Sequence, residues 1–488
     1  MYDVAVIGGG VTGCAIAREL SRYRLSIVII EKHEEVSFGT TKTNSGIIHA
    51  GHHSPPDTLK GKLVVRGNKL YDKLCKELNF GFRRIGELVV ARSESEIPEL
   101  ERLKNQGEAK GVPGLEIWDR ERLRNAEPNL STTLVAALHA PSAGVINPYE
   151  LANALCENAV DNGVDLKVNR AVEKIDAGQR FLDVHTAPET IRARFVINCA
   201  GVYADRIAGM VGLNDFTIHP RKGEEYMLDK RLKGLVQRLI FPIPKKNTKG
   251  ILIIPTFDGT IMVGPTAQDT EDREDVSTTY DGSEQVFGFV SRICPSITER
   301  DTITEFAGLR AVSNTNDFII GTTRIKGFIN AAGIQSPGLT SAPAIALYVR
   351  DILKSEGLVL KKKEKFRPHL SGPPRFASLD DEQQKRLIVK NRLFAKVVCR
   401  CELVTEAEIH SAIDHGARTL DGIKFRSRAG MGRCQGGFCA PRCMDILSKR
   451  LDKPFEEITK RGGDSWVVRR MDDTESEKVS IDCDAGTD

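Results

Sequence analysis

The sequence predicts an α/β protein with two or three domains. Its 488 residues exceed what a single hydrophobic core usually organises. An apolar run at residues 2–7 leads into a glycine turn, a stretch with helical spacing, and a second apolar run at residues 25–30. This pattern predicts a strand, a helix and a second buried strand. Two close pairs of cysteines stand far from this region, near the C-terminus, which indicates a separate segment with its own chemistry.

Composition and charge argue against several classes of protein. The 70 basic and 66 acidic residues leave a formal net charge of +4, without the basic stripe that a nucleic-acid partner would favour. No apolar run reaches the length of about 18 residues that a transmembrane helix needs. The N-terminus lacks a basic region and a cleavage site, so we expect no signal peptide. With only 11 cysteines, we expect a reduced, cytoplasmic protein that reaches a membrane only through a partner.

The first fifty residues carry a dinucleotide-binding pattern, in which G8-G-G10-V-T-G13 follows one strand and opens a helix. The first glycine permits a tight turn, the second lets the backbone approach a pyrophosphate, and the third allows close packing of helix on strand. Unpaired N–H groups of the helix N-terminus face the phosphates. The acid that ends the second strand can accept hydrogen bonds from a ribose, which favours FAD or NAD over NADP. A turn that binds nothing is the alternative. The candidate cofactor-binding residues are Gly8, Gly10, Val11, Thr12, Gly13, Glu31 and Lys32.

The loop that follows is rich in small polar residues and glycine. The stretches VIGGGVTGCAIARELSR and NSGIIHAG resemble the FAD-dependent oxidoreductase superfamily that includes D-amino-acid oxidase. The resemblance implies that the loop lies along the flavin and that His49 lies near the isoalloxazine and the substrate. A histidine that bonds only to backbone is the structural alternative. The loop residues expected to contact the cofactor are Thr41, Asn44, Ser45 and Gly46.

Three later segments also resemble pieces of this superfamily's FAD domain. D165LKVNRAVEKID is expected to form one strand that lends backbone groups to the adenine, and A193RFVINCAGVYAD forms a strand beneath the cofactor. F328INAAGIQSPGLTSAPAIALYV gives a strand, a glycine loop and a helix whose positive end stabilises charge on the reduced flavin. Together they imply one Rossmann-type domain built from discontinuous segments. The residues expected at the cofactor are Val172, Ala200, Gly201, Gly333, Gly338, Leu339 and Thr340.

Strand-rich stretches between these pieces, such as F80GFRRIGELVVARS and G250ILIIPTFDGTIMVGPTA, predict an antiparallel sheet in a substrate domain. Residues 361–392 are rich in charge and proline, which is typical of a linker, and the acidic end of the chain is expected to be disordered. The expected organisation is an oxidoreductase region at 1–360 (FAD-binding at about 1–80, 146–215 and 305–360; substrate domain at about 81–145 and 216–304), a linker at 361–392, a small helical domain at 393–470 and an acidic tail at 471–488.

The resemblance also implies a small anionic substrate that carries a hydroxyl group. Arg310 occupies the position from which the superfamily presents an arginine to the substrate anion, and a guanidinium suits a carboxylate or phosphate. A structural ion pair is the alternative. His49 would remove the hydroxyl proton while the flavin takes a hydride from the same carbon. His53, Arg221 and Lys222 are further substrate-binding candidates, although the last two could equally lie in a strand or turn without touching substrate.

Two substrates compete within this chemistry. The run Pro-Asp-Thr-Leu-Lys after the histidines resembles the L-2-hydroxyglutarate dehydrogenases. His53 stands where the glycerol-phosphate enzymes carry an arginine, which weakens the glycerol 3-phosphate alternative. The C-terminal cysteines favour glycerol 3-phosphate, oxidised to dihydroxyacetone phosphate, for the reason that follows. A third alternative is an electron-transfer or zinc-stabilised scaffold subunit that keeps FAD and has lost its substrate chemistry.

The late cysteines form the pattern Cys399-x-Cys401 and Cys434-x4-Cys439. Four thiolates suit zinc or an iron–sulfur centre, whereas a reduced compartment disfavours disulfides. The stretches CRCELVTEAEIHSAI and GMGRCQGGFC resemble the BFD-like [2Fe-2S] domain that follows the flavin domain in anaerobic glycerol-3-phosphate dehydrogenases. The resemblance implies that these four cysteines hold a [2Fe-2S] cluster, which passes electrons one at a time to a quinone, a partner flavoprotein or an electron-transfer subunit. Zinc is the alternative at the same cysteines.

Two features near these cysteines can be predicted from local chemistry. Thr405 with Glu408 has the spacing of a capping box, in which each side chain satisfies a free backbone group at the start of a helix. Cys443 lies just beyond the motif and is expected to be a packed thiol rather than a fifth ligand.

Overall fold

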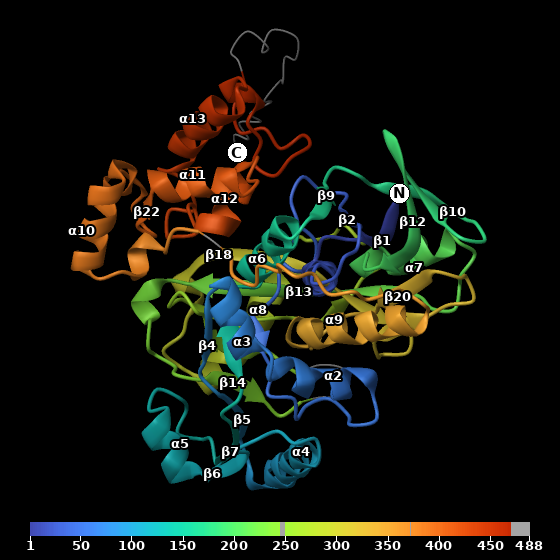
Figure 1. Ribbon diagram of the computed structural model, residues 1–488. Helices are drawn as coiled ribbons and strands as arrows, with labels where there is room; N and C mark the ends of the chain where they lie inside the picture. The colour runs from blue at the N-terminus through green and yellow to red at the C-terminus, as the bar shows by residue number, and fades with distance from the viewer. Residues whose placement is uncertain (245–248, 371, 470–488) are drawn as a thin grey trace, which may run out of the picture. The chain divides into compact units, whose positions relative to one another are not determined.

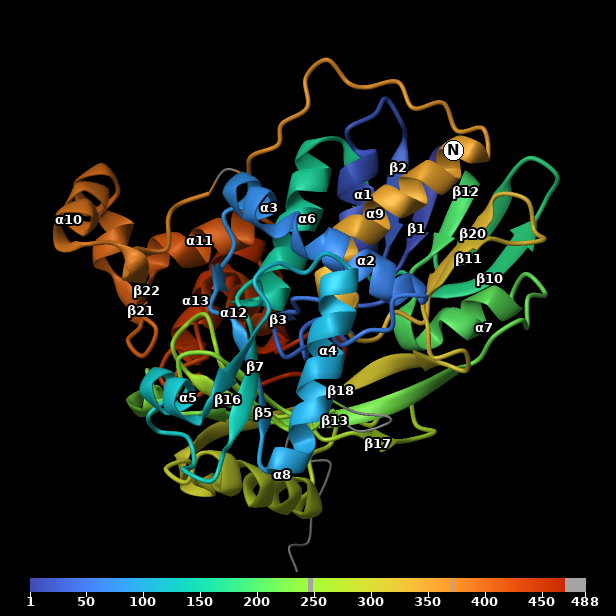
Figure 2. The same cartoon turned by 90° about the horizontal axis from the view of Figure 1, so that it is seen from below.

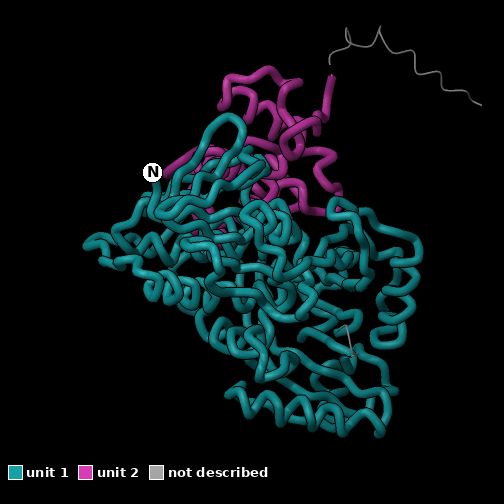
Figure 3. Tube along the Cα trace, turned by 90° about the vertical axis from the view of Figure 1, so that its right-hand side faces the viewer, with its two compact units in different colours: residues 1–372 teal, residues 373–488 magenta. Residues whose placement is uncertain are grey.

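The computed structural model describes residues 1–244, 249–370 and 372–469. The chain divides into two compact units, residues 1–372 and 373–488 (Figure 3). The acidic tail expected at 471–488 lies outside the described residues. Among the described residues, no helix combines the length and the apolar character needed to cross a bilayer.

The first unit contains an eight-stranded sheet, seen on the right in Figure 1. Its strand order is β10-β11-β12-β1-β2-β9, with β20 also beside β12 and β19 beside β20. The strands β9, β2, β1, β12 and β20 pair in parallel, and β10, β11 and β19 pair antiparallel. The bounds are β1 Tyr2–Ile7, β2 Ile27–Ile30, β9 Val164–Lys167, β10 Val172–Ala177, β11 Leu182–Thr186, β12 Glu189–Asn198, β19 Ile319–Thr322 and β20 Phe328–Ala332.

Alternate side chains of β1 enter two different cores. Val4 and Val6 pack with side chains of α1, α6 and α9, while Ala5 and Ile7 pack with α7 and the strands β10 and β11. Successive residues of a strand point to opposite faces, so a strand covered on both faces is apolar at every position. Figures 1 and 2 show α1, α6 and α9 together on one side of this sheet. The bounds are α1 Val11–Leu20, α2 Leu59–Asn68, α3 Tyr71–Leu78, α6 Pro148–Asp161, α7 Ala204–Gly209 and α9 Gly338–Ser355.

The single strand expected over residues 165–176 is wrong, because the structure breaks it into β9 and β10. Asn169 adopts a left-handed φ of 53°, a conformation that asparagine tolerates better than most residues. The N–H groups of Asn169 and Arg170 donate to the carbonyls of His33 and Glu31, each at 2.9 Å. The break therefore holds the chain against the end of β2.

A second sheet of nine strands has the order β17-β13-β16-β15-β14-β5-β7-β6, with β18 also beside β13. We expected an antiparallel sheet, but β5 and β14 pair in parallel, so the sheet is mixed. Strand β18 pairs with β13 along nearly its whole length, and the expected domain boundary at residue 305 falls inside it. The bounds are β5 Glu87–Ala91, β6 Glu116–Asp119, β7 Ala136–Ala140, β13 Ile218–Leu228, β14 Leu239–Pro242, β15 Leu252–Pro255, β16 Ile261–Gly264, β17 Gln268–Asp269 and β18 Thr302–Ser313.

Smaller elements surround the two sheets. Strands β3, β8 and β4 form a three-stranded sheet in which β8 pairs with both of the others. Helix α4 packs on β7 and β6 of the large sheet, and α8 lies near β16. The bounds are β3 Ile47–Ile48, β4 Phe82–Arg84, β8 Gly144–Ile146, α4 Ile97–Ala109, α5 Arg120–Ala126 and α8 Tyr280–Ile293.

The segment expected to be a linker is largely tied down. The Arg367 carbonyl accepts hydrogen bonds from the side-chain amides of Asn158 and Asn162, at 3.0 and 2.9 Å. Further along, α10 (Asp381–Lys390) begins with a capping box, and Phe376 and Phe394 stack beside it within the second unit. The charged residues that suggested a linker are the exposed side chains of α10. Its few apolar side chains pack against the cluster that contains Phe376 and Phe394.

The second unit is small and mostly helical. A short hairpin, β21 (Val397–Cys399) and β22 (Val404–Thr405), precedes the helices α11 (Glu406–Asp414), α12 (Leu420–Ser427) and α13 (Ala440–Leu451). The predicted capping box of Thr405 and Glu408 is confirmed, because the Glu408 carboxylate accepts the Thr405 N–H at 2.8 Å. Cys443 is 3% exposed on α13, as a packed thiol should be.

Candidate functional site

The loops that follow the parallel strands of the first sheet all start from one of its edges. Strands β1, β2, β12 and β20 run in the same direction, so their carboxyl ends lie together, where α/β proteins bind ligands. The expected cofactor residues in these loops and at the starts of α1 and α9 are Gly8, Gly10, Val11, Thr12, Gly13, Glu31, Lys32, Ala200, Gly201, Gly333, Gly338, Leu339 and Thr340.

The turn between β1 and α1 has room for a pyrophosphate only because of its glycines. Gly8 has a φ of 108°, and a Cβ there would lie 2.4 Å from the Cys199 carbonyl oxygen. A Cβ on Gly13 would lie 2.1 Å from the Gly8 carbonyl oxygen. At Gly10, by contrast, a Cβ would approach only the Thr41 hydroxyl, at 3.3 Å. The backbone at Gly10 is therefore open to a ligand, and the residues present fit the phosphates of a dinucleotide.

Glu31 is held at the end of β2 by the backbone. Its Oε2 accepts the Gly9 N–H at 2.6 Å, and its Oε1 accepts the His33 N–H at 2.9 Å. Burial raises the pKa of Glu31, while these N–H groups act in the opposite direction. A carboxylate offers about four lone-pair positions, so both oxygens keep capacity for ribose hydroxyls. Lys32 lies 4.1 Å from the centre of the Tyr203 ring.

The loop from Thr40 to Gly46 rests against β18. The Thr40 hydroxyl donates to the Leu309 carbonyl at 2.7 Å. A Cβ on Gly308 would lie 2.1 Å from the Thr43 hydroxyl, so the loop passes directly over this glycine. Asn44 accepts the Gly46 N–H at 2.9 Å, and Ser45 donates to Glu225 of β13. The loop predicted to follow the flavin thus lies between the first sheet and the second.

His49 lies at the end of this loop and is 7% exposed. Its N–H donates to the Thr340 hydroxyl at 3.0 Å, which joins it to the first turn of α9. Its Nε2 lies 3.1 Å from Lys249 Nζ and 3.3 Å from Ser336 Oγ. A charged lysine can only donate, so Nε2 accepts, and the ring proton of neutral His49 is on Nδ1. Burial, with Lys249 and His52 nearby, holds the pKa of His49 well below its usual value, which keeps the ring neutral.

A buried carboxylate stands behind this histidine. Glu87, at the start of β5, is 0% exposed, and its oxygens lie 3.9 Å from His49 Nδ1 and 3.3 Å from His52 Nδ1. Burial raises the pKa of Glu87 and lowers that of His52 to about 3. The His53 ring lies against that of His52, with ring centres 4.1 Å apart and the planes tilted by 40°, and burial lowers the pKa of His53 as well. His49, His52 and Glu87 thus form one buried titratable cluster together with Lys249.

Arg310 and Glu225 approach the same region from the second sheet. Both Nη atoms of Arg310 donate to the Thr266 carbonyl at 3.2 Å. A Cβ on Gly223 would lie 2.6 Å from Nη2, so the guanidinium crosses β13 where the strand has no side chain. Glu225 is 1% exposed, and burial raises its pKa to about 7. The charge of Arg310 contributes, after burial, to lowering the pKa of Lys249.

The other two candidate cations, Arg221 and Lys222, are on opposite faces of β13. Arg221 pairs directly with Arg310 across β13 and β18, so both side chains are on one face, and its Nε donates to Asp269 at 2.6 Å. Lys222 is on the opposite face, because the strand alternates, and its Nζ donates to Asp275 at 2.8 Å. That bond lowers the pKa of Asp275 to about 2. A substrate contact by Lys222 stays a prediction that its position does not favour.

Sequence reasoning missed Lys249, Ser336, Glu87 and Glu225. Lys249 lies 200 positions from His49 in the chain, and nothing in its lysine-rich neighbourhood distinguishes it. Glu87 did offer a signal, because it adjoins the apolar run LVVA and heads a buried strand. A carboxylate buried without its full set of hydrogen bonds is unusual and marks a functional position.

The four cysteines of the C-terminal motif meet in the second unit. Cys401 Sγ lies 3.6 Å from Cys434 Sγ, and a hydrogen bond between Cys399 and Cys439 raises the pKa of Cys399. Metal–sulfur bonds of about 2.3 Å in a tetrahedron separate the sulfurs by roughly 3.8 Å, so this spacing fits a metal. A Cβ on Gly432 would lie 2.2 Å from the Cys401 Cβ, so only glycine lets the two cysteine loops approach.

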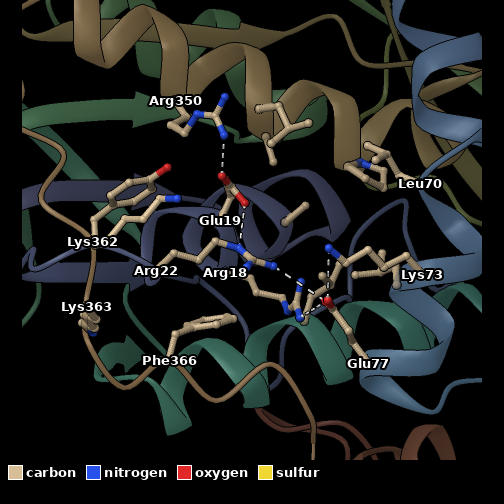
Figure 4. Close-up of a pocket in the computed structure, with 17 residues that line it drawn as sticks. Arg18, Glu19, Arg22, Leu70, Lys73, Glu77, Arg350, Lys362, Lys363 and Phe366 are labelled. Atoms are coloured by element: carbon tan, nitrogen blue, oxygen red, sulfur yellow. Dashed lines mark hydrogen bonds and ion pairs between the residues drawn. The ribbon is translucent and has the colours of Figure 1, made fainter.

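A cavity of about 400 Å³ lies at the other end of α1 (Figure 4). The arginines that line it pair with two acids. Glu19 accepts from Arg22 and Arg350, at 3.0 and 2.8 Å, and Glu77 accepts from Arg18 at 2.7 Å. Arginines also suit the negative end of a helix. These pairs join α1 to α3 and α9, which is a structural role.

A sheet edge whose loops suit a dinucleotide, together with a buried histidine and lysine, is typical of a cofactor-dependent oxidoreductase. Residues 3–352 match the FAD dependent oxidoreductase family, and the chain belongs to this family. Residues 397–449, which include all four motif cysteines, match the BFD-like [2Fe-2S] binding domain. The two cofactors predicted from the sequence are confirmed at this level, and the match favours an iron–sulfur cluster over zinc.

The similar proteins share this organisation to different extents. The glycerol 3-phosphate dehydrogenase of Caloramator mitchellensis is 46% identical over 474 residues, which cover 96% of this chain and 98% of that protein. The structure of reduced L-alpha-glycerophosphate oxidase from Mycoplasma pneumoniae with FAD bound has a TM-score of 0.73 and 32% identity, and covers 76% of this chain and 99% of that one. Human mitochondrial L-2-hydroxyglutarate dehydrogenase is 31% identical over 283 residues, which cover 54% of this chain and 61% of that protein.

Proposed function

We propose that the chain oxidises glycerol 3-phosphate to dihydroxyacetone phosphate with FAD and delivers the electrons through a [2Fe-2S] cluster to another redox partner. The observation that carries this proposal is the pair of His49 and Lys249, 3.1 Å apart, with Arg310 on the strand that the 40–46 loop contacts. It combines a neutral base with two cations, as the oxidation of an anionic alcohol requires. The resemblance to a glycerol 3-phosphate dehydrogenase over nearly the whole chain, cysteine motif included, supports this substrate.

FAD supplies the hydride acceptor. Its binding residues in this proposal are those of the glycine turn, Glu31 and Lys32, the loop at 41–46, Val172, and the loops after β12 and β20. The N-terminal end of α9 carries a partial positive charge that favours an anionic flavin edge. Thr340, in the first turn of α9, also accepts the His49 N–H, so the base and the flavin share one support.

His49 acts as the general base in this proposal. Its Nε2 carries the lone pair and accepts the proton of the substrate hydroxyl as the carbon loses a hydride. The ring then becomes a cation, with its Nδ1–H facing Glu87 at 3.9 Å. Burial raises the pKa of Glu87 to about 8, so Glu87 fixes the orientation of the ring in either form and stabilises the positive ring when it is ionised. Glu87 is therefore a positioning residue for the base.

Arg310 and Lys249 bind the anionic end and orient the reacting carbon. Arg310 presents its guanidinium on the face of β18 that meets the 40–46 loop. Lys249 bridges His49 and Ser336, so it can hold a substrate oxygen next to the base. Two cations suit a phosphate better than a single carboxylate, and His53 and Arg221 are secondary candidates for the same anion.

Replacing Arg310 by alanine is expected to raise the KM for glycerol 3-phosphate by about 10²-fold or more, because a charge-assisted contact with the substrate anion is lost. FAD binding should stay unchanged. Steady-state kinetics gives the KM, and the flavin content of the purified variant gives the control. Arg310→Lys should recover part of the loss, since it restores the charge without the fork. Equal loss of substrate and FAD binding would contradict this role.

The pH dependence of kcat/KM should reflect Lys249. Burial lowers the pKa of Lys249 well below its ordinary value of 10.5, so the lysine loses its charge as the pH rises through that lowered pKa. The alkaline limb of the profile should therefore lie well below 10.5. Lys249→Arg should move this limb upward, because arginine stays charged. A limb at the same pH in both proteins would exclude Lys249 as its origin.

Anaerobic mixing with candidate substrates tests the function as a whole. Bleaching of the flavin by glycerol 3-phosphate alone supports the proposal. Bleaching by L-2-hydroxyglutarate supports the alternative that the histidine at position 53 favours, and bleaching by neither supports a subunit without substrate chemistry. An assay of iron and acid-labile sulfide separates a [2Fe-2S] cluster from zinc.

A further inference from the structure

The metal-binding loops of the second unit lie partly at its surface. Cys401 is exposed and Cys434 is half-buried, whereas Cys399 and Cys439 are buried, each 2% exposed. A cluster on these four sulfurs would therefore have one edge close to solvent. Electrons leave such a centre most readily through its exposed edge, so the side chains around Cys401 and Cys434 face whatever accepts them.

Large apolar side chains flank this edge. Phe438, which directly precedes Cys439, is 84% exposed, and Leu403, two residues after Cys401, is 37% exposed. Phe376 and Phe394 of the same unit are 5% and 6% exposed, so the unit buries other phenylalanines well. Exposed apolar groups beside a functional centre are typical of a contact surface.

Exposed arginines occur in the same two loops and in the first turn of α13. Arg400, Arg433 and Arg442 are exposed, and each lies within three residues of a motif cysteine. The acid nearest in sequence, Glu402, is 9% exposed and accepts a hydrogen bond from Arg428 at 2.9 Å. We define the outlet face as Arg400, Leu403, Arg433, Phe438 and Arg442.

We propose that the outlet face is the docking surface for a separate redox protein whose own cofactor is surrounded by acidic residues. The inference rests on the proposed function, because it assumes that electrons leave through the cluster. In each encounter the reduced cluster loses one electron and the partner gains it, so each oxidised substrate requires two encounters. The arginines attract and orient an acidic partner, and Phe438 with Leu403 forms the dry centre of the contact.

The partner is unidentified, so cytochrome c serves as the probe in two forms with the same haem. Native cytochrome c is cationic, and its succinylated form is anionic. At low salt, the holoenzyme with glycerol 3-phosphate should reduce the anionic form about tenfold or more faster than the native form, as expected of electrostatic steering. This preference should decline as salt approaches physiological strength, where charges farther apart than about 8 Å are screened.

The variant Arg400→Gln/Arg433→Gln/Arg442→Gln should abolish the preference. Its matched control, Lys385→Gln/Arg386→Gln/Lys390→Gln on α10, removes the same charge from exposed positions outside the motif and should keep the preference. Phe438→Ser should slow the reduction of both forms of cytochrome c and leave the salt dependence of these rates unchanged. Iron, sulfide and substrate-driven flavin bleaching should equal those of the unaltered protein in all three variants.

Calorimetry with ferric succinylated cytochrome c and the oxidised protein gives a second readout without turnover. Binding at low salt should weaken about tenfold or more in the arginine variant and stay unchanged in the control. Equal behaviour of the arginine and control variants would overturn the proposal. So would an arginine variant whose cluster is reduced slowly by substrate, since the face would then meet the chain's own flavin unit. Absence of flavin bleaching or of iron in the unaltered protein would instead overturn the proposed function. The calorimetric binding experiment would still test whether the outlet face binds an acidic redox protein.

Discussion

His49→Ala is expected to slow substrate-driven flavin reduction by about 10²–10⁴-fold, the usual contribution of a general base. The alanine variant keeps the backbone N–H that bonds Thr340, so the loop and the start of α9 should retain their structure. The two groups that bond to Nε2 do not replace its lone pair, because Lys249 is a donor when charged and Ser336 is a poor base. Stopped-flow mixing with glycerol 3-phosphate under anaerobic conditions measures the rate directly.

The matched control for this prediction is His52→Gln. His52 belongs to the same buried cluster, and its Nδ1 lies 3.3 Å from the other oxygen of Glu87 than the one that faces His49. Its replacement should cost less than about tenfold, because its ring does not bond to Nε2 of the base. A loss of similar size in both variants would mean that the cluster is structural. A loss of less than about tenfold in His49→Ala would remove this histidine as the base.

The sequence predicted the Rossmann-type region well because its chemistry is local. The tight turn at Gly8 and the close packing at Gly13 need glycines at fixed spacing, and β1 and β2 are apolar at nearly every position because both faces are covered. The capping box at Thr405 is local in the same way. These patterns depend on residues a few positions apart, so one sequence is sufficient to find them.

Long-range placement could not be predicted in the same way. Lys249 lies between β14 and β15, and the assembly of the second sheet brings it to His49. No local sequence pattern predicts that arrangement. The face that Lys222 presents depends on the register of β13, where a shift of one residue exchanges inside and outside. The break at Asn169 is a local event, but it is stabilised by carbonyls near Glu31 that only the fold brings close.

Cys434→Ser is expected to separate the two halves of the reaction. Glycerol 3-phosphate should still bleach the flavin at the rate of the unaltered protein, because the base and both cations belong to the first unit. Cytochrome c reduction should fall to background, since serine is a poor ligand for iron and the cluster is lost. Cys434 is half-buried rather than a core residue, so the second unit should tolerate the change. Anaerobic bleaching, iron content and cytochrome c reduction together measure the outcome.

Cys443→Ser is the matched control, because its thiol contacts Cys439 and yet is packed on α13 outside the proposed ligand set. That variant should keep its iron and its electron transfer. If both serine variants lost iron equally, the assignment of Cys434 as a ligand and of Cys443 as a packed thiol would be wrong. If Cys434→Ser lost the cluster and still reduced cytochrome c at full rate, electrons would leave directly from the flavin. The C-terminal unit would then need another role. A one-electron centre is useful only if the two electrons of the reduced flavin pass through it, one at a time, on their way to the acceptor.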